Sequence, residues 1–188
     1  MATHLMNILK SNKCWSVLSQ NEIRTFINSN IGNIDALIEL ATSDNKEYNF
    51  RIVWLLFKGT KKNDPRIKPF LSDLISGIEN KKSGHQRELI RLIMKHELSD
   101  NQESALYDQC IVIWKDLSLK PGTRYYAYLF LHKLSLKYPE LMNELRHFFT
   151  EIYLETLSPG IKHSIQKKTT ELRLNSDFQK NNKRLSTG

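Results

Sequence analysis

The sequence of 188 residues has little glycine and proline, with 7 and 5 respectively, and only 2 cysteines. Because tight β-turns depend on glycine, its scarcity disfavours a fold built from many strands and favours helices. Cys14 and Cys110 lie far apart, and no CxxC or Cys/His ligand spacing occurs. With no disulfide framework to indicate an oxidising compartment, we expect a cytoplasmic protein.

Long hydrophobic runs are also missing. The longest, Ile52 to Phe57, is far shorter than the roughly 20 apolar residues that a membrane-spanning helix needs. Residues 1–10 do not combine a basic stretch with an apolar core, so we expect no secretory signal. The length is that of one soluble domain with a hydrophobic core of its own.

The familiar catalytic and cofactor motifs do not occur either. The sequence contains no GxxxxGK[ST] or GxGxxG loop, no GxSxG nucleophile turn and no HExxH pair among its 6 histidines. We therefore predict no cofactor, no metal ligand and no catalytic residue, which favours a binding protein over an enzyme.

Positive charge is in excess and is unevenly distributed. The net charge is +8, and residues 51–100 carry 11 basic against 6 acidic groups. Residues 151–188 add 7 basic against 4 acidic groups. This balance favours acidic protein surfaces and polyanions as partners.

Apolar residues recur at helical spacing along the chain, whereas no comparable stretch alternates with period two. Helices are predicted to start near Asp64-Pro65, Ser99-Asp100-Asn101 and Pro139, where capping residues or proline stand. The predicted buried stripes are Ile67, Leu71, Leu74 and Ile78; Leu106, Cys110, Ile113 and Leu117; and Leu141, Leu145, Phe148 and Ile152.

A repeat becomes visible when Arg51, Arg87 and Arg124 are aligned, because each begins a similar amphipathic segment and a second one follows it. Two-helix units of about 35–45 residues are typical of HEAT and armadillo solenoids. We predict an all-α fold, a right-handed α-solenoid of about four helix hairpins. Their predicted ranges are 19–43, 46–79, 84–118 and 122–157, after a cap helix at 1–13 and before a basic terminal helix and mobile tail at 158–188.

Several segments resemble a group of short bacterial HEAT/armadillo-like proteins: Arg-x-x-Trp-Leu-Leu at 51–56, Tyr-Tyr-Ala-Tyr-Leu-Phe-Leu at 125–131, Lys-Tyr-Pro-Glu-Leu at 137–141 and Ser-Pro-Gly-Ile-Lys at 158–162. The resemblance implies a helical-repeat protein without an established activity. The chain is also similar in size and charge to HEAT-like DNA glycosylases, which use a Trp, an Asp and an Arg on one concave surface. Trp114 and Asp116 do not match that arrangement, because two residues on a helix at this spacing point about 200° apart.

The predicted binding surface is the concave face lined by the second helix of each hairpin, and its most favoured ligand is another protein or an acidic segment of one. The residues that we expect on this face are Arg66, Asp73, Asp108, Gln109, Glu144 and Arg146. The arginine series at Arg51, Arg87 and Arg124 has two interpretations: a groove for phosphates or carboxylates, or a ladder that pairs with neighbouring repeats. Sequence-independent nucleic-acid binding through Lys61, Lys62 and nearby lysines is the alternative function.

Overall fold

A computed structural model describes residues 20–29, 34–43, 49–148 and 150–170, and the predicted cap helix 1–13 lies outside these ranges. Every regular element in the described ranges is helical, which agrees with the all-α prediction. The chain forms two compact units, Met1–Gln109 (unit 1) and Cys110–Gly188 (unit 2). No helix within the described part is both long and apolar enough to span a bilayer.

Unit 1 contains six helical elements and the first part of a seventh. They are α2 (Gln20–Ser29), α3 (Ile34–Thr42), α4 (Asn49–Gly59), the short 3₁₀ helix η2 (Lys68–Phe70), α5 (Leu71–Ser76), α6 (Ser83–Ile93) and the part of α7 (Asp100–Lys115) up to Gln109.

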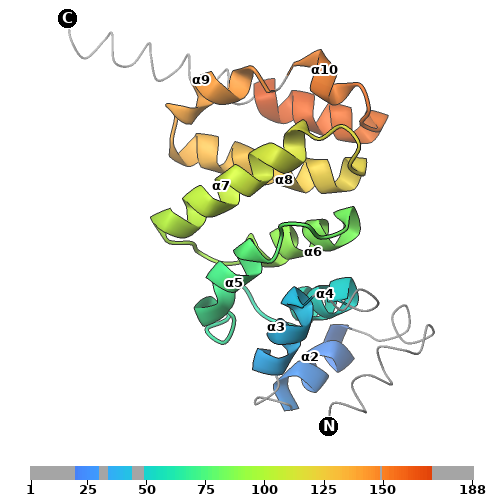
Figure 1. Ribbon diagram of the computed structural model, residues 1–188, viewed down its shortest axis with the longest axis vertical. Helices are drawn as coiled ribbons and strands as arrows, with labels where there is room; N and C mark the ends of the chain where they lie inside the picture. Colours follow the sequence, from blue (N-terminus) through green and yellow to red (C-terminus); the bar gives the residue numbers. More distant parts are fainter. Residues whose placement is uncertain (1–19, 30–33, 44–48, 149, 171–188) are drawn as a thin grey trace, which may run out of the picture. The chain divides into compact units, whose positions relative to one another are not determined.

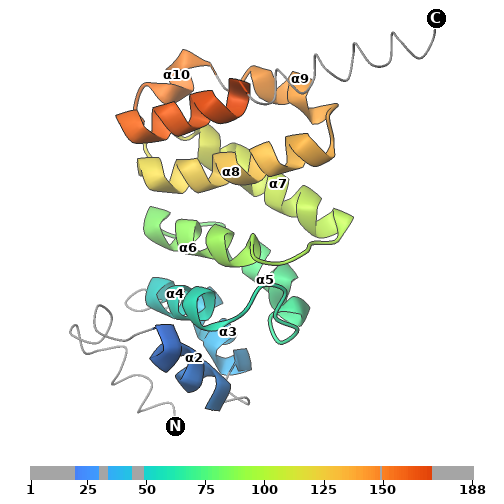
Figure 2. The same ribbon diagram turned by 180° about the vertical axis from the view of Figure 1, so that it is seen from behind.

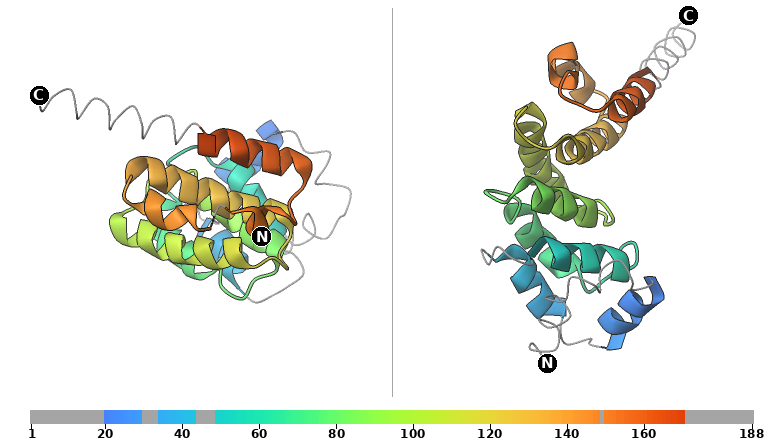
Figure 3. Two further views of the ribbon diagram at one scale, coloured as in Figure 1. Left: turned by 90° about the horizontal axis from the view of Figure 1, so that it is seen from above. Right: turned by 90° about the vertical axis from the view of Figure 1, so that its right-hand side faces the viewer.

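The helices of unit 1 form two layers, which Figures 1 and 2 show from opposite sides. One layer consists of α2, α4 and α6, since α4 packs against both of the others. The second layer contains α3 and α5, and α3 packs against α4 as well. The right-hand view of Figure 3 shows α3 and α5 on one side of this unit, with α2, α4 and α6 on the other. Alternate helices therefore belong to alternate layers, as in a stack of helix hairpins.

The predicted stripe in the segment 65–79 is confirmed: Ile67, Leu71, Leu74 and Ile78 are fully buried between the layers. The predicted helix start at Asp64-Pro65 is wrong. Residues 65–67 form turns, and the regular α-helix begins only at Leu71. The reason is local, because the Asp64 carboxylate accepts hydrogen bonds from the backbone and side chain of Arg66 and so closes a turn in place of capping a helix.

Unit 2 contains the end of α7, α8 (Pro121–Lys137), α9 (Leu141–Arg146), α10 (Glu151–Leu154) and a helix over residues 159–170. Leu106, Cys110 and Ile113 are buried as predicted, but Leu117 follows the end of α7 and is 38% exposed. The third stripe is not one helix. The indole of Trp114 donates a hydrogen bond to the carbonyl of Phe148, near the break between α9 and α10, and Ile152 is 61% exposed.

Hydrogen bonds between distant residues have a characteristic separation in sequence. Arg66 reaches Asn28, Lys81 reaches Ser43 and Lys95 reaches Phe57, and each pair is 38 residues apart. In unit 2, Tyr128 reaches Ile165, which is 37 residues away, and Tyr125 reaches Ser164 at a separation of 39. These values are close to the spacing of the aligned arginines, so within each unit the side chains connect segments that are about one repeat apart.

Candidate functional site

A groove of about 410 Å³ lies between α5 and the first part of α7 in unit 1. The segments on its α5 side contribute hydroxyl groups and one carboxylate, and those on its α7 side contribute mainly amides. The lining residues are Ser72, Ile75, Ser76, Glu79, Ser99, Asn101, Gln102, Ala105 and Gln109. Among the described residues that line the groove, only Glu79 is charged, so this lining is neutral to acidic.

Gln102 connects α7 to α5 at the groove. Its side-chain amide donates to the Ser72 hydroxyl at 3.1 Å, and its carbonyl oxygen accepts from the Ser99 backbone at 3.1 Å. Within the described ranges, the side chains of Asn101 and Gln109 make no such bonds. Gln102, Ala105 and Gln109 share one face of α7, since the second and third lie three and seven residues after the first. The small Ala105 leaves space between two amides.

A second, basic pocket lies on the other layer of unit 1, between α2 and the turn that follows α4. It has a volume of about 490 Å³ and is lined by Arg24, Asn28, Gly59, Lys61, Asp64, Pro65 and Arg66. Three of these residues are cationic and one is anionic. Lys61 and Arg66 were predicted as binding residues, but Arg66 lies in this pocket and does not line the groove with Gln109.

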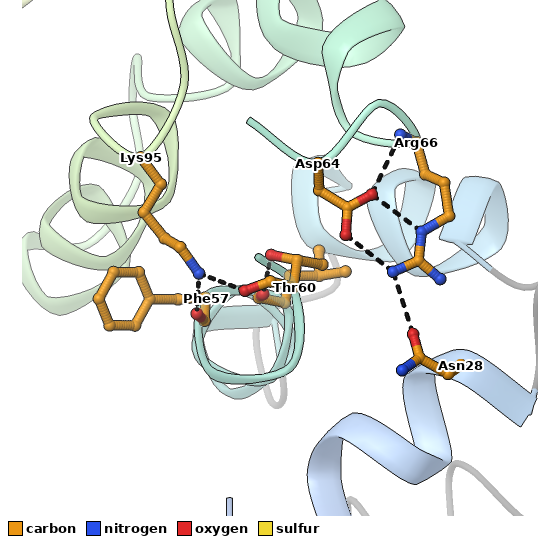
Figure 4. Close-up of polar contacts among 7 residues, drawn as sticks. Asn28, Phe57, Thr60, Asp64, Arg66 and Lys95 are labelled. Atoms are coloured by element: carbon orange, nitrogen blue, oxygen red, sulfur yellow. Dashed lines mark hydrogen bonds and ion pairs between the residues drawn. The ribbon is translucent and has the colours of Figure 1, made fainter. Parts of the chain in front are cut away.

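The Arg66 guanidinium is held by two partners, as Figure 4 shows. Its Nε and Nη2 donate to the two carboxylate oxygens of Asp64 at 2.9 and 2.8 Å, and Nη2 also donates to Asn28 at 3.2 Å. Asp64 is 1% exposed, and the hydrogen bond with Arg66 lowers its pKa to about 2 despite the opposing effect of burial. Arg66 is therefore fixed in position along one edge of its guanidinium.

The turn that carries Lys61 and Asp64 is fixed by Asn63. This residue has a left-handed backbone with φ of 53°, a conformation that asparagine tolerates better than most residues. Its side-chain amide donates to the Glu97 carboxylate, and its carbonyl oxygen accepts from the Glu97 backbone, both at 2.9 Å. The turn after α4 is thus attached to the segment that follows α6.

Lys95 completes the basic region beside this turn (Figure 4). Its ammonium group donates to the carbonyls of Phe57 at 2.7 Å and Thr60 at 2.5 Å, which lie at the end of α4. Burial lowers the pKa of Lys95, and the positive charges of Arg24 and Lys58 lower it further. The carboxylate of Asp64 acts in the opposite direction and raises the pKa of Lys95.

The three aligned arginines have different surroundings. Arg124 is fully buried in unit 2, where it donates to the carbonyls of Trp114 and Tyr153 and to the Thr156 hydroxyl. Arg87 is 43% exposed and pairs with the buried Glu88 beside it, while Arg51 lies 5.7 Å from the ring of Phe50. Arg124 therefore stabilises its own unit and presents no accessible surface.

The other predicted site residues do not gather at one place. Asp73 and Asp108 are exposed on α5 and α7 but outside the lining of the groove, and Lys62 is exposed beside the basic pocket. Glu144 is exposed on α9 in unit 2; Arg146 ends that helix, and its side chain is not among the described ones. Trp114 is fully buried, so it offers no ring to a nucleic-acid base.

The sequence reasoning missed several residues of both cavities. Ser72 and Ser76 share a face of α5, and Gln102 and Ala105 share one with Gln109; such i, i+4 and i, i+3, i+7 sets of small or amide residues were the available signal. Arg24 and Asn28 of α2 were also missed, because nothing in α2 alone indicates a pocket. The described side chains contain no group of three His, Cys, Asp or Glu residues suited to a metal ion.

A family model described as a HEAT repeat domain matches residues 12–171. The chain belongs to the HEAT repeat family. The matched range includes every labelled helix of both units, together with the groove and the basic pocket. HEAT repeats present extended surfaces to binding partners, and the two cavities lie on such repeats. None of the curated proteins or solved structures with which the sequence was compared matches it.

Proposed function

We propose that this protein is a non-enzymatic binding module that holds an extended segment of another protein in the groove between α5 and α7. The repeats would continue as a right-handed stack of about four hairpins, with the second helices lining the binding face. The groove carries the proposal, because Asn101 and Gln109 line it and their side-chain amides make no hydrogen bond to another described residue.

The spacing of the amides suits an extended backbone. Gln102 and Gln109 are separated by about 10 Å along α7, at 1.5 Å per helical residue. This distance equals about three residues of an extended chain. Side-chain amides can both donate to and accept from a peptide backbone, and the Gln102 amide keeps a second N–H beside its bond to Ser72. The two residues could therefore bind peptide groups about three residues apart, while Ala105 admits the chain between them.

The charge of the groove favours a neutral or basic segment. Glu79 lies in the lining, and Asp73 and Asp108 are exposed nearby on the two helices that form the groove. An acidic segment or a nucleic acid would meet only like charge here. Part of the positive charge of residues 51–100 lies instead at the basic pocket, which Lys61 and Arg66 line.

The proposal can be tested by selecting peptides from a random display library on the purified chain and measuring their affinities for two variants. Ala105→Arg would fill the groove, whereas Ser104→Arg adds an arginine at the neighbouring exposed position outside it. We expect enriched peptides with Lys or Arg residues, and we expect Ala105→Arg to weaken their binding about tenfold or more.

The control Ser104→Arg adds the same charge and should bind the same peptides within about twofold, since exposed charges outside the contact contribute little to affinity. Failure to enrich any peptide would contradict the proposal. Equal loss of binding in the two variants would contradict it as well, because the effect would then come from charge and not from the groove.

The alternative function, sequence-independent nucleic-acid binding, rests on the exposed side chains of Lys61, Lys62 and Lys68. It predicts affinity for duplex or single-stranded DNA and RNA that falls steeply between about 50 and 200 mM salt. A fluorescence-anisotropy titration over that range measures it. Weak binding that does not change when Lys61 and Lys62 are replaced by alanine would reject this alternative.

A further inference from the structure

The basic pocket of unit 1 is a feature that peptide binding in the groove does not explain. It lies on the layer of α2 and α4, whereas the groove lies between α5 and α7. From the charges, contacts and size of this pocket, we propose that it is a binding site for a phosphate monoester.

The first argument is the state of Arg66. Asp64 and Asn28 bind its Nε and Nη2, so the guanidinium cannot rotate freely. Its Nη1 makes no hydrogen bond to any residue in the described ranges, and Figure 4 shows this nitrogen beyond the bonded edge. An arginine fixed in this way presents two N–H donors at no further conformational cost, which is the arrangement that phosphate recognition uses.

The second argument is the balance of charge. The described lining residues include three cations, Arg24, Lys61 and Arg66, and one carboxylate, that of Asp64, which Arg66 already neutralises. The remaining charge of +2 matches a phosphate monoester, which carries about −1.5 to −2 at neutral pH. Neither Arg24 nor Lys61 has a hydrogen-bonding or ion-pairing partner for its side chain among the described residues.

The third argument is the like-charge crowding around the pocket. Arg24 and Lys58 both act on Lys95, whose ammonium is bound to the end of α4. Lys58 and Lys95 lie outside the lining of the pocket, and they add to the positive potential that Arg24, Lys61 and Arg66 produce inside it. A dianion in the pocket would be stabilised by this potential. The contacts of Asn63 with Glu97 hold the turn that carries Lys61 in place.

The size and lining favour a compact phosphorylated group over a nucleic-acid strand. A volume of about 490 Å³ accommodates a small phosphate ester or one phosphorylated side chain with its neighbours. None of the described residues that line the pocket is aromatic, so this lining offers bases no stacking platform. A ligand with a single carboxylate would neutralise only part of the remaining charge of the pocket.

The test is an NMR titration of the full chain with O-phosphoserine and with inorganic phosphate, at constant ionic strength in chloride. We expect saturable shifts of the amides of Arg24, Lys61 and Arg66. The matched variants are Lys61→Ala and Lys62→Ala, because the two lysines are consecutive, both are exposed and only Lys61 lines the pocket. Lys61→Ala should raise the dissociation constant about fivefold or more, and Lys62→Ala less than about twofold.

Lys61→Ala could weaken binding by changing the local structure of the turn. A second variant, Arg24→Ala, tests the site without altering that turn, since Arg24 is exposed on α2. It should also weaken binding about fivefold. Shifts that do not saturate by about 10 mM ligand, or equal effects of Lys61→Ala and Lys62→Ala, would overturn the proposal, since net charge alone would then explain the data.

Two further ligands distinguish the source of the phosphate. A phosphoserine peptide that binds at least about ten times more tightly than O-phosphoserine would show that the phosphate belongs to a partner protein. Equal affinities would show that the ligand is a small phosphate ester, and both results support the site. A single-stranded oligonucleotide that displaces O-phosphoserine and depends equally on Lys61 and Lys62 would overturn it in favour of nucleic-acid binding.

Discussion

In unit 1 the carbonyls at the ends of α3 and α4 are hydrogen-bonded by Lys81 and Lys95, which lie on a later repeat. In unit 2 the carbonyl of Trp114, near the end of α7, is hydrogen-bonded by the fully buried Arg124. Both units thus supply donors to carbonyl groups that a helix leaves unsatisfied at its end. They differ in whether water can replace the donor.

This difference has consequences for stability and for binding. The hydrogen bonds of Lys95 at the end of α4 are only partly buried, so this lysine stabilises unit 1 modestly. Its ammonium group also contributes positive charge to the surface. The carbonyl of Trp114 is buried, so it depends on Arg124. The same repeat chemistry therefore gives a half-exposed ammonium beside the basic pocket in one unit and a buried guanidinium in the other.

The largest expected effect is that of Arg124→Met. The substitution leaves the carbonyls of Trp114 and Tyr153 without their donor, which costs about 3 kcal/mol or more of the free energy of unfolding. Urea denaturation with hydrogen exchange at the amides of α8 measures this loss.

The matched control is Arg87→Met, at the corresponding position of the previous repeat. Arg87 is 43% exposed, and Arg91 also pairs with Glu88, so the loss should stay below about 1 kcal/mol. Similar losses for the two arginines would contradict the distinction between a buried anchor and a surface pair.

The second effect is a pH dependence of unit 1. Burial lowers the pKa of His85 to about 4 from 6.5, although its hydrogen bond to the backbone of Ala41 acts in the opposite direction. Between these pH values the unfolded chain binds more protons, so the free energy of unfolding falls as the pH falls from about 6.5 to 4. The expected loss is on the order of 2 kcal/mol.

Denaturation midpoints measured between about pH 7.5 and 4.5 test this prediction, with His85→Gln as the comparison. Burial lowers the pKa of His96 as well, so the variant should lose part of the pH dependence and not all of it. Asp64, with a pKa of about 2, contributes only below about pH 4. An unchanged slope in the variant would show that His85 is not the group that titrates.

The smallest effect is expected for Lys95→Met, at about 1 kcal/mol, because water can replace the ammonium at the end of α4. The exposed Lys62 makes none of these contacts, so Lys62→Met should change the free energy of unfolding by less than about 0.5 kcal/mol. Chemical denaturation of both variants gives the comparison. A loss for Lys95→Met as large as that for Arg124→Met would remove the difference between the units.

The helical fold could be predicted from the sequence because its apolar residues recur at helical spacing. Ile67, Leu71, Leu74 and Ile78 form a stripe that only a buried helical face explains, and all are fully buried. The interruption between α9 and α10 could not be predicted, since it involves the Trp114 indole, which donates to a carbonyl 34 residues away.

The candidate site was harder to predict for a similar reason. A lysine near a helix end has the same local pattern whether it is solvated or bonded to a neighbouring repeat, so Lys81 and Lys95 gave no signal. Arg66 was identified as a binding residue, but its location depends on Asn28, which is 38 residues earlier. Only Gln109 among the predicted concave residues lines the groove.

The regular separation of these hydrogen-bonding partners also bears on how such a chain evolves. Lys81 and Ser43, Lys95 and Phe57, and Tyr128 and Ile165 are each about one repeat apart. The donor and acceptor of each pair lie on successive repeats, so a duplication or deletion of one whole repeat would again place flanking repeats at the separation at which such pairs form. Such chains can change length in whole repeats, and contacts of this modest range also permit rapid folding.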